Sequence, residues 1–218
     1  MKIKILVVLL VFSATVFAQQ DHLKTTLFSF TPKTNGVQEV NGLAIGLGLN
    51  MSEKNSIQKI NGLNIEINPL SIFILMFDDP ERRGLLNPPT VSVNGLSIGT
   101  GHSNMNENIA YSGVAISLFN AGYSCNGISV NGICNYTSQL NGIHLSGISN
   151  MSKSANGMFV AFSNYSENMN GIQIGFLNKT QNFNGLQIGI FNKSTTQKGI
   201  QIGFWNSNKK RSMPFINW

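Results

Sequence analysis

Charged side chains are scarce in this chain of 218 residues. Only 11% of the residues are Asp, Glu, Lys or Arg, and nine of these are acidic. The three histidines, His22, His102 and His144, lie far apart and show no metal-ligand spacing. Hydrolysis on a β-helix usually needs clustered carboxylates or a metal ion. The sequence therefore offers no catalytic, metal-binding or cofactor-binding residue, and we predict that the protein is not an enzyme.

The one acidic cluster lies in a segment that interrupts the rest of the pattern, residues 69–90. It contains an apolar run from Leu70 to Phe77, followed by Asp78, Asp79 and Glu81 among prolines. A run of eight residues is too short for a membrane-spanning helix. We expect a buried strand or hairpin and a solvated loop, with a membrane-dipping segment as the alternative. A polysaccharide-acting enzyme that uses the charges of residues 78–83 is a remote alternative function.

A second apolar stretch lies at the start of the chain. Lys2 and Lys4 precede an apolar stretch, and small residues end at Ala18, so residues 1–18 are predicted to be a cleaved secretory signal peptide. We therefore expect an exported protein at the cell surface, in the outer membrane or in the periplasm. Removing both lysines leaves 13 basic and 9 acidic residues, a net charge of +4 that is scattered except at residues 209–211. This charge pattern does not indicate a nucleic-acid partner.

Cysteine occurs only twice, at Cys125 and Cys134. In an exported protein an even pair can form a disulfide. In a flattened coil, however, positions nine residues apart fall on opposite walls or at opposite bends. Facing sheets are about 10 Å apart, which is more than a disulfide allows between Cα atoms. We therefore predict two separate thiols, with a disulfide as the alternative if the coil narrows there.

What the sequence has in abundance is a repeated unit, which reads NGIQIGFLN at residues 170–178 and NGLQIGIFN at residues 184–192. Asn alone occurs 29 times. The second-position glycines are spaced by 14–15 residues in the C-terminal half and by 18–33 residues earlier, where units carry insertions. These glycines are Gly42, Gly62, Gly95, Gly113, Gly127, Gly142, Gly157, Gly171, Gly185 and Gly199. Such a fixed period predicts stacked units that cover one another's apolar surface.

Alternation within each unit predicts a strand with one buried face. The apolar positions one and three residues after the glycine, for example Ile172 and Ile174, are expected to point inward. The position between them is expected to be exposed; it is occupied by Ala44, Ser97, Ser129, His144, Gln173, Gln187 and Gln201 among others. A third apolar column, two residues before the glycine, is expected to pack from the opposite wall. It comprises Val40, Ile60, Val93, Cys125, Leu140, Ala155, Met169 and Phe183.

Asn residues mark both ends of the unit, before the glycine and at its close, and are expected to lie at bends. Stacked amides can form hydrogen-bonded ladders. The closing Asn also begins Asn-x-Ser/Thr at Asn50, Asn135, Asn150, Asn164, Asn178 and Asn192. We interpret these as stacked Asn and hydroxyl columns, the hydroxyls being Ser152, Ser166, Thr180 and Ser194, rather than as glycan acceptors. A further column, Phe119, Leu177, Phe191 and Trp205, is expected to be core, with an exposed stripe as the alternative.

These patterns favour an all-β fold, a single parallel β-solenoid with 14–15-residue coils and capped ends. Asn-Gly also favours hairpins, so an antiparallel meander or an outer-membrane β-barrel is the alternative. Because every unit resembles the next, equivalent residues should stack on themselves, as in parallel coils. The expected organisation is signal peptide 1–18, N-terminal cap 19–34, repeat domain 35–206 with the insertion 69–90, and C-terminal cap 207–218.

The units VNGLSIG (residues 93–99), NGIQIGFLN and KGIQIGFWN (residues 198–206), with the closing KKRSMPFINW, resemble a family of Gram-negative bacterial surface-repeat proteins built from tandem NG-φ-Q-φ-G units. The resemblance implies an exported, envelope-associated protein and carries over no catalytic residue. We expect a non-enzymatic structural, adhesive or binding role at the cell envelope, with an integral outer-membrane β-barrel as the alternative. The partner is left open between an envelope polymer, a protein, the membrane and self-association through the repeat face.

Overall fold

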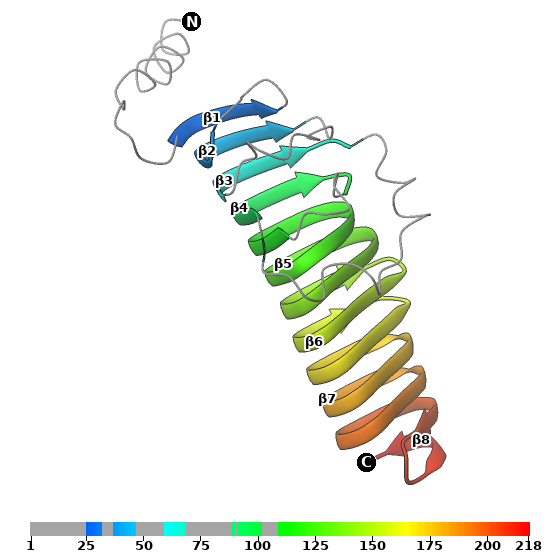
Figure 1. The fold of residues 1–218 in the computed structure, drawn as a ribbon. Coiled ribbons are helices and arrows are strands. Elements are labelled where there is room, and N and C mark those ends of the chain that lie inside the picture. The colour runs from blue at the N-terminus through cyan, green and yellow to red at the C-terminus, as the bar shows by residue number, and fades with distance from the viewer. Residues whose placement is uncertain (1–24, 32–36, 47–58, 69–88, 90, 102–108) are drawn as a thin grey trace, which may run out of the picture.

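The computed structural model describes residues 25–31, 37–46, 59–68, 89, 91–101 and 109–218. These residues form one sheet that winds into an elongated rod, with its first and last strands at opposite ends (Figure 1). No helix among them is long and apolar enough to cross a membrane. The strands are β1 (Thr25–Thr31), β2 (Glu39–Gly46), β3 (Lys59–Glu66), β4 (Val91–Gly99), β5 (Ile109–Ser146), β6 (Ser149–Val160), β7 (Ser163–Ser207) and β8 (Ser212–Asn217).

Every neighbouring pair from β1 to β7 is parallel. From β2 to β7 the pairs are in register with the repeat, whereas the β1–β2 pair shifts register between Thr26 and Phe28. Gly42 pairs with Gly62 and Gly62 with Gly95, across the insertions, just as Gly157 pairs with Gly171 in the regular part. The predicted β-solenoid is therefore confirmed, with coils of 14–15 residues in the C-terminal half. The described strands do not form the antiparallel meander or closed barrel that was the alternative.

Close stacking at the Asn-Gly bend explains its glycines. The glycine at this bend has a positive φ, for example +124° at Gly157, and residues other than glycine rarely adopt this backbone conformation. A Cβ at Gly157 would lie 2.0 Å from the carbonyl oxygen of Gly142 in the preceding coil. The preceding Asn residues form an amide ladder along this margin, in which Asn156 donates to Asn141 at 2.9 Å and Asn141 to Asn126 at 2.7 Å.

The predicted orientation of the strand faces is wrong. The middle position of each unit points into the coil, and Gln173, Gln187 and Gln201 are 0% exposed. The flanking apolar residues point outward: Ile188 is 37% exposed and Ile202 is 42% exposed. The alternation was identified correctly, but the position between the two apolar residues faces inward. Where this position is Gln, the buried amide bonds to its own copy in a neighbouring coil.

A continuous amide ladder fills this part of the interior. Gln201 Nε2 donates to Gln187 Oε1 at 2.7 Å, and Gln187 Nε2 donates to Gln173 Oε1 at 2.7 Å. Hydroxyls from the opposite wall complete the network, since Thr180 Oγ1 donates to Gln173 Oε1 at 2.9 Å. A buried polar group costs little when its hydrogen bonds are satisfied, so an amide interior is compatible with folding.

At the second bend the closing Asn residues are also buried and form the predicted ladder. Asn164 donates to Asn178 at 2.9 Å and Asn178 to Asn192 at 2.8 Å, and Asn178 Nδ2 also donates to the backbone carbonyl of Ile188. The hydroxyl column is buried as well, with Ser166 and Thr180 3.3 Å apart. The structural interpretation of Asn-x-Ser/Thr is therefore confirmed at Asn135, Asn150, Asn164, Asn178 and Asn192, whereas Asn50 lies outside the described residues.

The third column is the apolar core, as predicted. Val40, Leu140 and Phe183 are at most 2% exposed, and the other members of the column are buried too. Cys125 belongs to this core, whereas Cys134 packs in a separate cluster with Phe119. The two cysteines are buried thiols with no disulfide between them, which confirms the predicted separate thiols. Burial raises the pKa of Cys125 to about 12, so this thiol is unreactive at neutral pH.

The two ends of the rod differ among the described residues. At the N-terminal end, residues 27–30, predicted to lie in a cap, instead form β1, the outermost parallel strand of the sheet. At the other end β8 folds back antiparallel to β7, and Asn217 Nδ2 donates at 2.9 Å to Gln201 Oε1, the last acceptor of the Gln ladder. The predicted signal peptide and most of the insertion, including Leu70 to Phe77 and residues 78–83, lie outside the described residues.

Candidate binding surface

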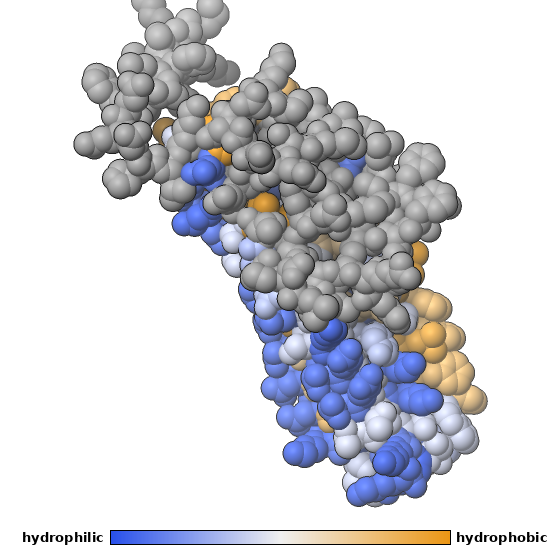
Figure 2. Space-filling view, in the orientation of Figure 1, coloured by the Kyte–Doolittle hydropathy of each residue, from blue (hydrophilic) through white to orange (hydrophobic). Residues whose placement is uncertain are grey.

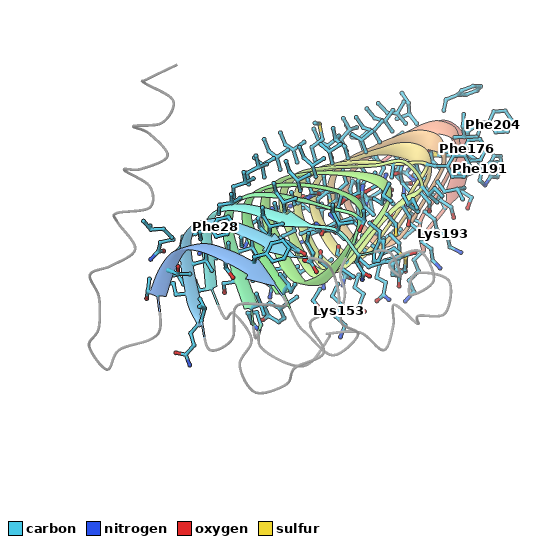
Figure 3. All side chains as sticks on the ribbon, turned by 90° about the horizontal axis from the view of Figure 1, so that it is seen from above. Phe28, Lys153, Phe176, Phe191, Lys193 and Phe204 are labelled. Carbon is cyan, nitrogen blue, oxygen red and sulfur yellow. The ribbon has the colours of Figure 1, made fainter. Side chains whose placement is uncertain are left out.

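The outward apolar positions form one continuous surface, which we call the apolar face. None of its members is buried. Figure 3 shows a dense row of carbon side chains projecting from one side of the rod, while Lys153 and Lys193 extend from another. The apolar face comprises Leu43, Ile45, Leu63, Ile65, Leu96, Ile98, Val114, Ile116, Ile128, Val130, Ile143, Leu145, Met158, Val160, Ile172, Ile174, Leu186, Ile188, Ile200 and Ile202.

A second set of exposed apolar side chains, the aromatic ridge, follows the apolar face around the second bend. Its members are 42–65% exposed, and the Phe162 and Phe176 rings stack at 5.0 Å between centroids. The core expectation for this region is therefore correct for Phe119, which is buried, and wrong for Leu177, Phe191 and Trp205. The ridge comprises Phe162, Phe176, Phe191, Phe204 and Trp205.

The apolar face is as large as the largest apolar patches on typical monomers. Ten coils at about 4.8 Å give a length of about 48 Å, and a width of about 12 Å gives roughly 600 Å². The largest apolar patch on a typical monomer is about 300–600 Å² and is often functional. At about 25 cal/mol per Å², covering this face is worth roughly 15 kcal/mol before the costs of association. The face is therefore the strongest candidate for a binding surface.

The chain's charges are distributed unevenly along the rod. Residues 109–148 contain no Asp, Glu, Lys or Arg, whereas residues 149–218 contain seven cations and one acid, Glu167. Figure 2 shows hydrophobic residues along one margin of this half and hydrophilic residues beside them. The cations are Lys153, Lys179, Lys193, Lys198, Lys209, Lys210 and Arg211.

The Asn-Gly margin carries a shallow groove of about 440 Å³. Asn168, Asn170 and Asn182 are among the residues that line it, and the buried side chains of Met169 and Phe183 form its floor. The exposed amides are already engaged with one another, since Asn182 donates to Asn168 at 2.9 Å and Asn184 to Asn170 at 3.1 Å. A groove whose amides are paired internally and whose apolar floor is covered offers a ligand little to bind.

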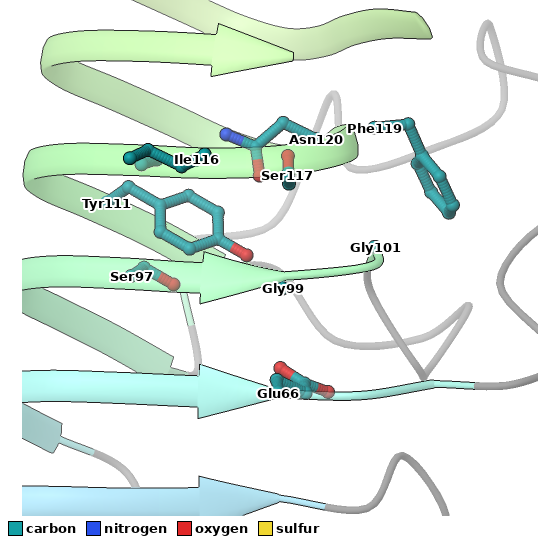
Figure 4. A pocket seen from close by; sticks show the side chains of 10 residues that line it. Glu66, Ser97, Gly99, Gly101, Tyr111, Ile116, Ser117, Phe119 and Asn120 are labelled. Carbon is teal, nitrogen blue, oxygen red and sulfur yellow. The ribbon is translucent and has the colours of Figure 1, made fainter. Parts of the chain in front are cut away.

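A small pocket lies where β3, β4 and β5 meet (Figure 4). Glu66, Ser97, Tyr111 and Asn120 are among the residues that line it, but its internal volume is about 10 Å³, the space of one water molecule at most. No group of three or more His, Cys, Asp and Glu residues among those described could hold a metal ion. The pocket beside Glu66, which replaces the usual glycine, is therefore too small to hold a substrate.

His144, expected on the exposed face, is 0% exposed and lies inside the coil. Its Nδ1 is 2.8 Å from Ser129 Oγ, its ring packs against Phe159, and its Nε2 has no hydrogen-bond partner among the described residues. Burial is the main cause that lowers its pKa from 6.5 to about 4, partly opposed by a backbone hydrogen bond at Asn141. The folded protein therefore holds a neutral imidazole here.

We expect this histidine to make the fold acid-sensitive. The unfolded chain binds a proton below pH 6.5 and the folded chain only near pH 4, so stability is complete above pH 6.5 and falls as the pH drops towards 4. The total loss is about 3 kcal/mol. Urea unfolding at pH 7 and pH 4.5 measures it. His144→Gln, which matches other members of the column, should remove most of the difference; an equal pH dependence in this variant would contradict the assignment.

Sequence reasoning located every residue of the apolar face but assigned the face to the core. One signal for the true orientation is the identity of Gln173, Gln187 and Gln201, because an interior ladder requires the same amide in each coil whereas an exposed position does not. Comparisons with protein-family models, with curated proteins and with solved structures found no match to this chain.

Proposed function

We propose that this is a non-enzymatic, exported protein that binds a component of the cell envelope through its apolar face. The observation that carries the proposal is the uninterrupted exposure of that face over the described repeat, while the strand position between its two columns is buried. Contiguous exposed apolar patches of this size often mark interaction sites. The rod supplies a rigid, flat support, because each coil is bonded to its neighbours by backbone and side-chain ladders.

Three further features support a binding role at the envelope. The predicted signal peptide would direct the chain out of the cytoplasm, and the resemblance to Gram-negative surface-repeat proteins is consistent with a location in the cell envelope. Among the residues that the structure describes, the two pockets offer no substrate-sized reactive site. A solenoid repeats the same contact in every coil, so weak contacts along its face add up.

Site-specific photo-crosslinking in the native host tests this function. A benzoylphenylalanine replaces Phe176, which is 42% exposed on the ridge, or Gln181, which is exposed on the opposite wall. We expect an adduct from position 176, in the envelope fraction, and none from position 181. Equal adducts from both positions, no adduct from either, or a cytosolic location would each reject the proposal.

A further inference from the structure

We propose that the apolar face lies on an anionic lipid surface, with the rod axis parallel to the membrane plane. This inference rests on the proposed function and names the component that is bound. Three features of the molecule support it: the shape of the exposed surface, the position of its aromatic residues and the positive charge of the same half of the chain.

The chemistry of the face suits a fluid apolar phase. Its two columns contain only Leu, Ile, Val and one Met, with no polar side chain to fix the position of a protein partner. The exposed apolar surface does not stop at the flat face, because Phe176 and Leu177 continue it around the second bend at 42% and 39% exposure. A flat protein partner covers one plane only, whereas lipid chains can surround both the plane and the bend.

The position of the ridge argues against a second copy as the occupant of the face. A face-to-face pair would cover the flat face but would leave the ridge around the bend uncovered. A membrane, by contrast, also provides an environment for aromatic rings, which favour the boundary between headgroups and acyl chains.

Charge complementarity selects an anionic surface. Lys179 and Lys193 each follow a buried Asn directly after the ridge, so they are placed on the side wall beside it. Peripheral elements that bind in the interface bury their apolar side about 5–10 Å deep and keep cations at the headgroups. Because the two walls of the coil are only about 10 Å apart, the remaining cations of residues 149–218 also lie within about one Debye length of such a surface.

The C-terminal cap extends the same surface. Phe215, Ile216 and Trp218 are 50–72% exposed, and Phe215 adopts a left-handed backbone with φ +66°, an unusual conformation for a bulky side chain. The Arg211 guanidinium lies 4.2 Å from the Trp218 ring centroid, and its Nη2 donates to the Trp218 backbone carbonyl. The cap therefore presents apolar groups and a cation together, as an interfacial anchor does.

The test uses the full chain and its own two tryptophans, Trp205 and Trp218. Vesicles of phosphatidylcholine, with or without phosphatidylglycerol, are titrated while tryptophan emission is recorded, and brominated lipids serve as quenchers. We expect a blue shift and quenching that are stronger with phosphatidylglycerol. Trp218→Phe leaves Trp205 as the sole reporter, and this residue should still be quenched because it lies on the ridge.

Matched variants in the same chain assign the binding to the face, because any contribution of residues 1–18 is common to all of them. Ile188→Asn with Ile202→Asn should weaken binding on the order of tenfold or more. Gln181→Asn with Thr195→Asn, on the exposed opposite wall, should leave it unchanged. Lys179→Gln with Lys193→Gln should reduce the preference for phosphatidylglycerol by roughly fivefold per lysine. Circular dichroism checks that each variant is folded.

Three results would overturn the lipid assignment: no vesicle binding, binding that is insensitive to the Ile188 and Ile202 substitutions, or a dimer that dissociates with those substitutions and does not bind vesicles. A protein adduct from position 176 in cells together with no vesicle binding would reject the lipid assignment alone and leave the proposed function standing. No adduct from position 176 would reject both.

Discussion

Replacing Gln187 by Glu is expected to destabilise the protein by about 3–5 kcal/mol at pH 7, because an ionised group without a partner would be buried. The exchange keeps the size of the side chain but removes the donor. Gln187 Nε2 lies 2.7 Å from Gln173 Oε1 and 3.3 Å from Thr180 Oγ1, so a carboxylate oxygen there would face the Gln173 acceptor. Thermal or urea unfolding measures the loss.

The matched control is the next residue, Ile188→Glu, which adds the same charge on the exposed face. Ile188 is 37% exposed, so we expect a change within about 1 kcal/mol. The usual assumption that apolar residues point inward predicts the reverse order. Finding that order would show that Ile188 is buried and Gln187 is exposed. Comparing Gln187→Glu with the natural chain at several pH values adds a second check. The deficit should shrink in acid as the buried carboxyl is protonated and regains a donor.

The fold could be predicted from the sequence because the coil is a local property. Each unit carries its own bends, and the 14–15-residue spacing of Gly142, Gly157 and Gly171 fixes which residues stack. Parallel stacking, the Asn ladders, the core column that includes Phe183, and the separate cysteines all follow from this period. None of these predictions needs to know which side of the strand is buried.

The orientation of the strand could not be predicted by the same reasoning. Period-2 alternation separates Gln187 from Ile188 but says nothing about which side faces the interior. Transfer energies favour burying Ile, yet they describe a single side chain. A stacked Gln bonds to its copies in both neighbouring coils, as Gln187 does with Gln173 and Gln201, so its burial cost is offset by neighbours that lie 14 residues away.

The candidate binding surface was missed for the same reason. A prediction that buries Ile188 and Ile202 leaves only amides and hydroxyls outside, and such a surface indicates no particular partner. Once the ladder is recognised as the interior, the same residues become a broad apolar face. Predicting the binding surface therefore required knowing which face of the strand is buried, and the composition of the strand does not determine this.

The Asn-Gly bend gives the second large effect. Gly157→Ala is expected to destabilise the protein by about 3 kcal/mol or more, through a positive φ and a steric clash that cannot be relieved by a side-chain movement. The added Cβ would lie 2.0 Å from the Gly142 carbonyl oxygen, and that oxygen belongs to the backbone of the neighbouring coil. The two coils must therefore separate locally or the bend must change.

Gly132→Ala is the matched control, because it makes the same chemical change on the same sheet. A Cβ at Gly132 would make ordinary van der Waals contacts with Leu118, at 3.4 Å from its Cδ2 and 3.8 Å from its backbone, so we expect a change of about 0.5 kcal/mol or less. Hydrogen exchange distinguishes a local from a global effect. Since solenoid stability is carried by contacts between adjacent coils, protection should fall around residues 142–171 and persist around Asn192 and Gln201. Equal melting of Gly157→Ala and Gly132→Ala would show that close carbonyl stacking does not require glycine at this bend.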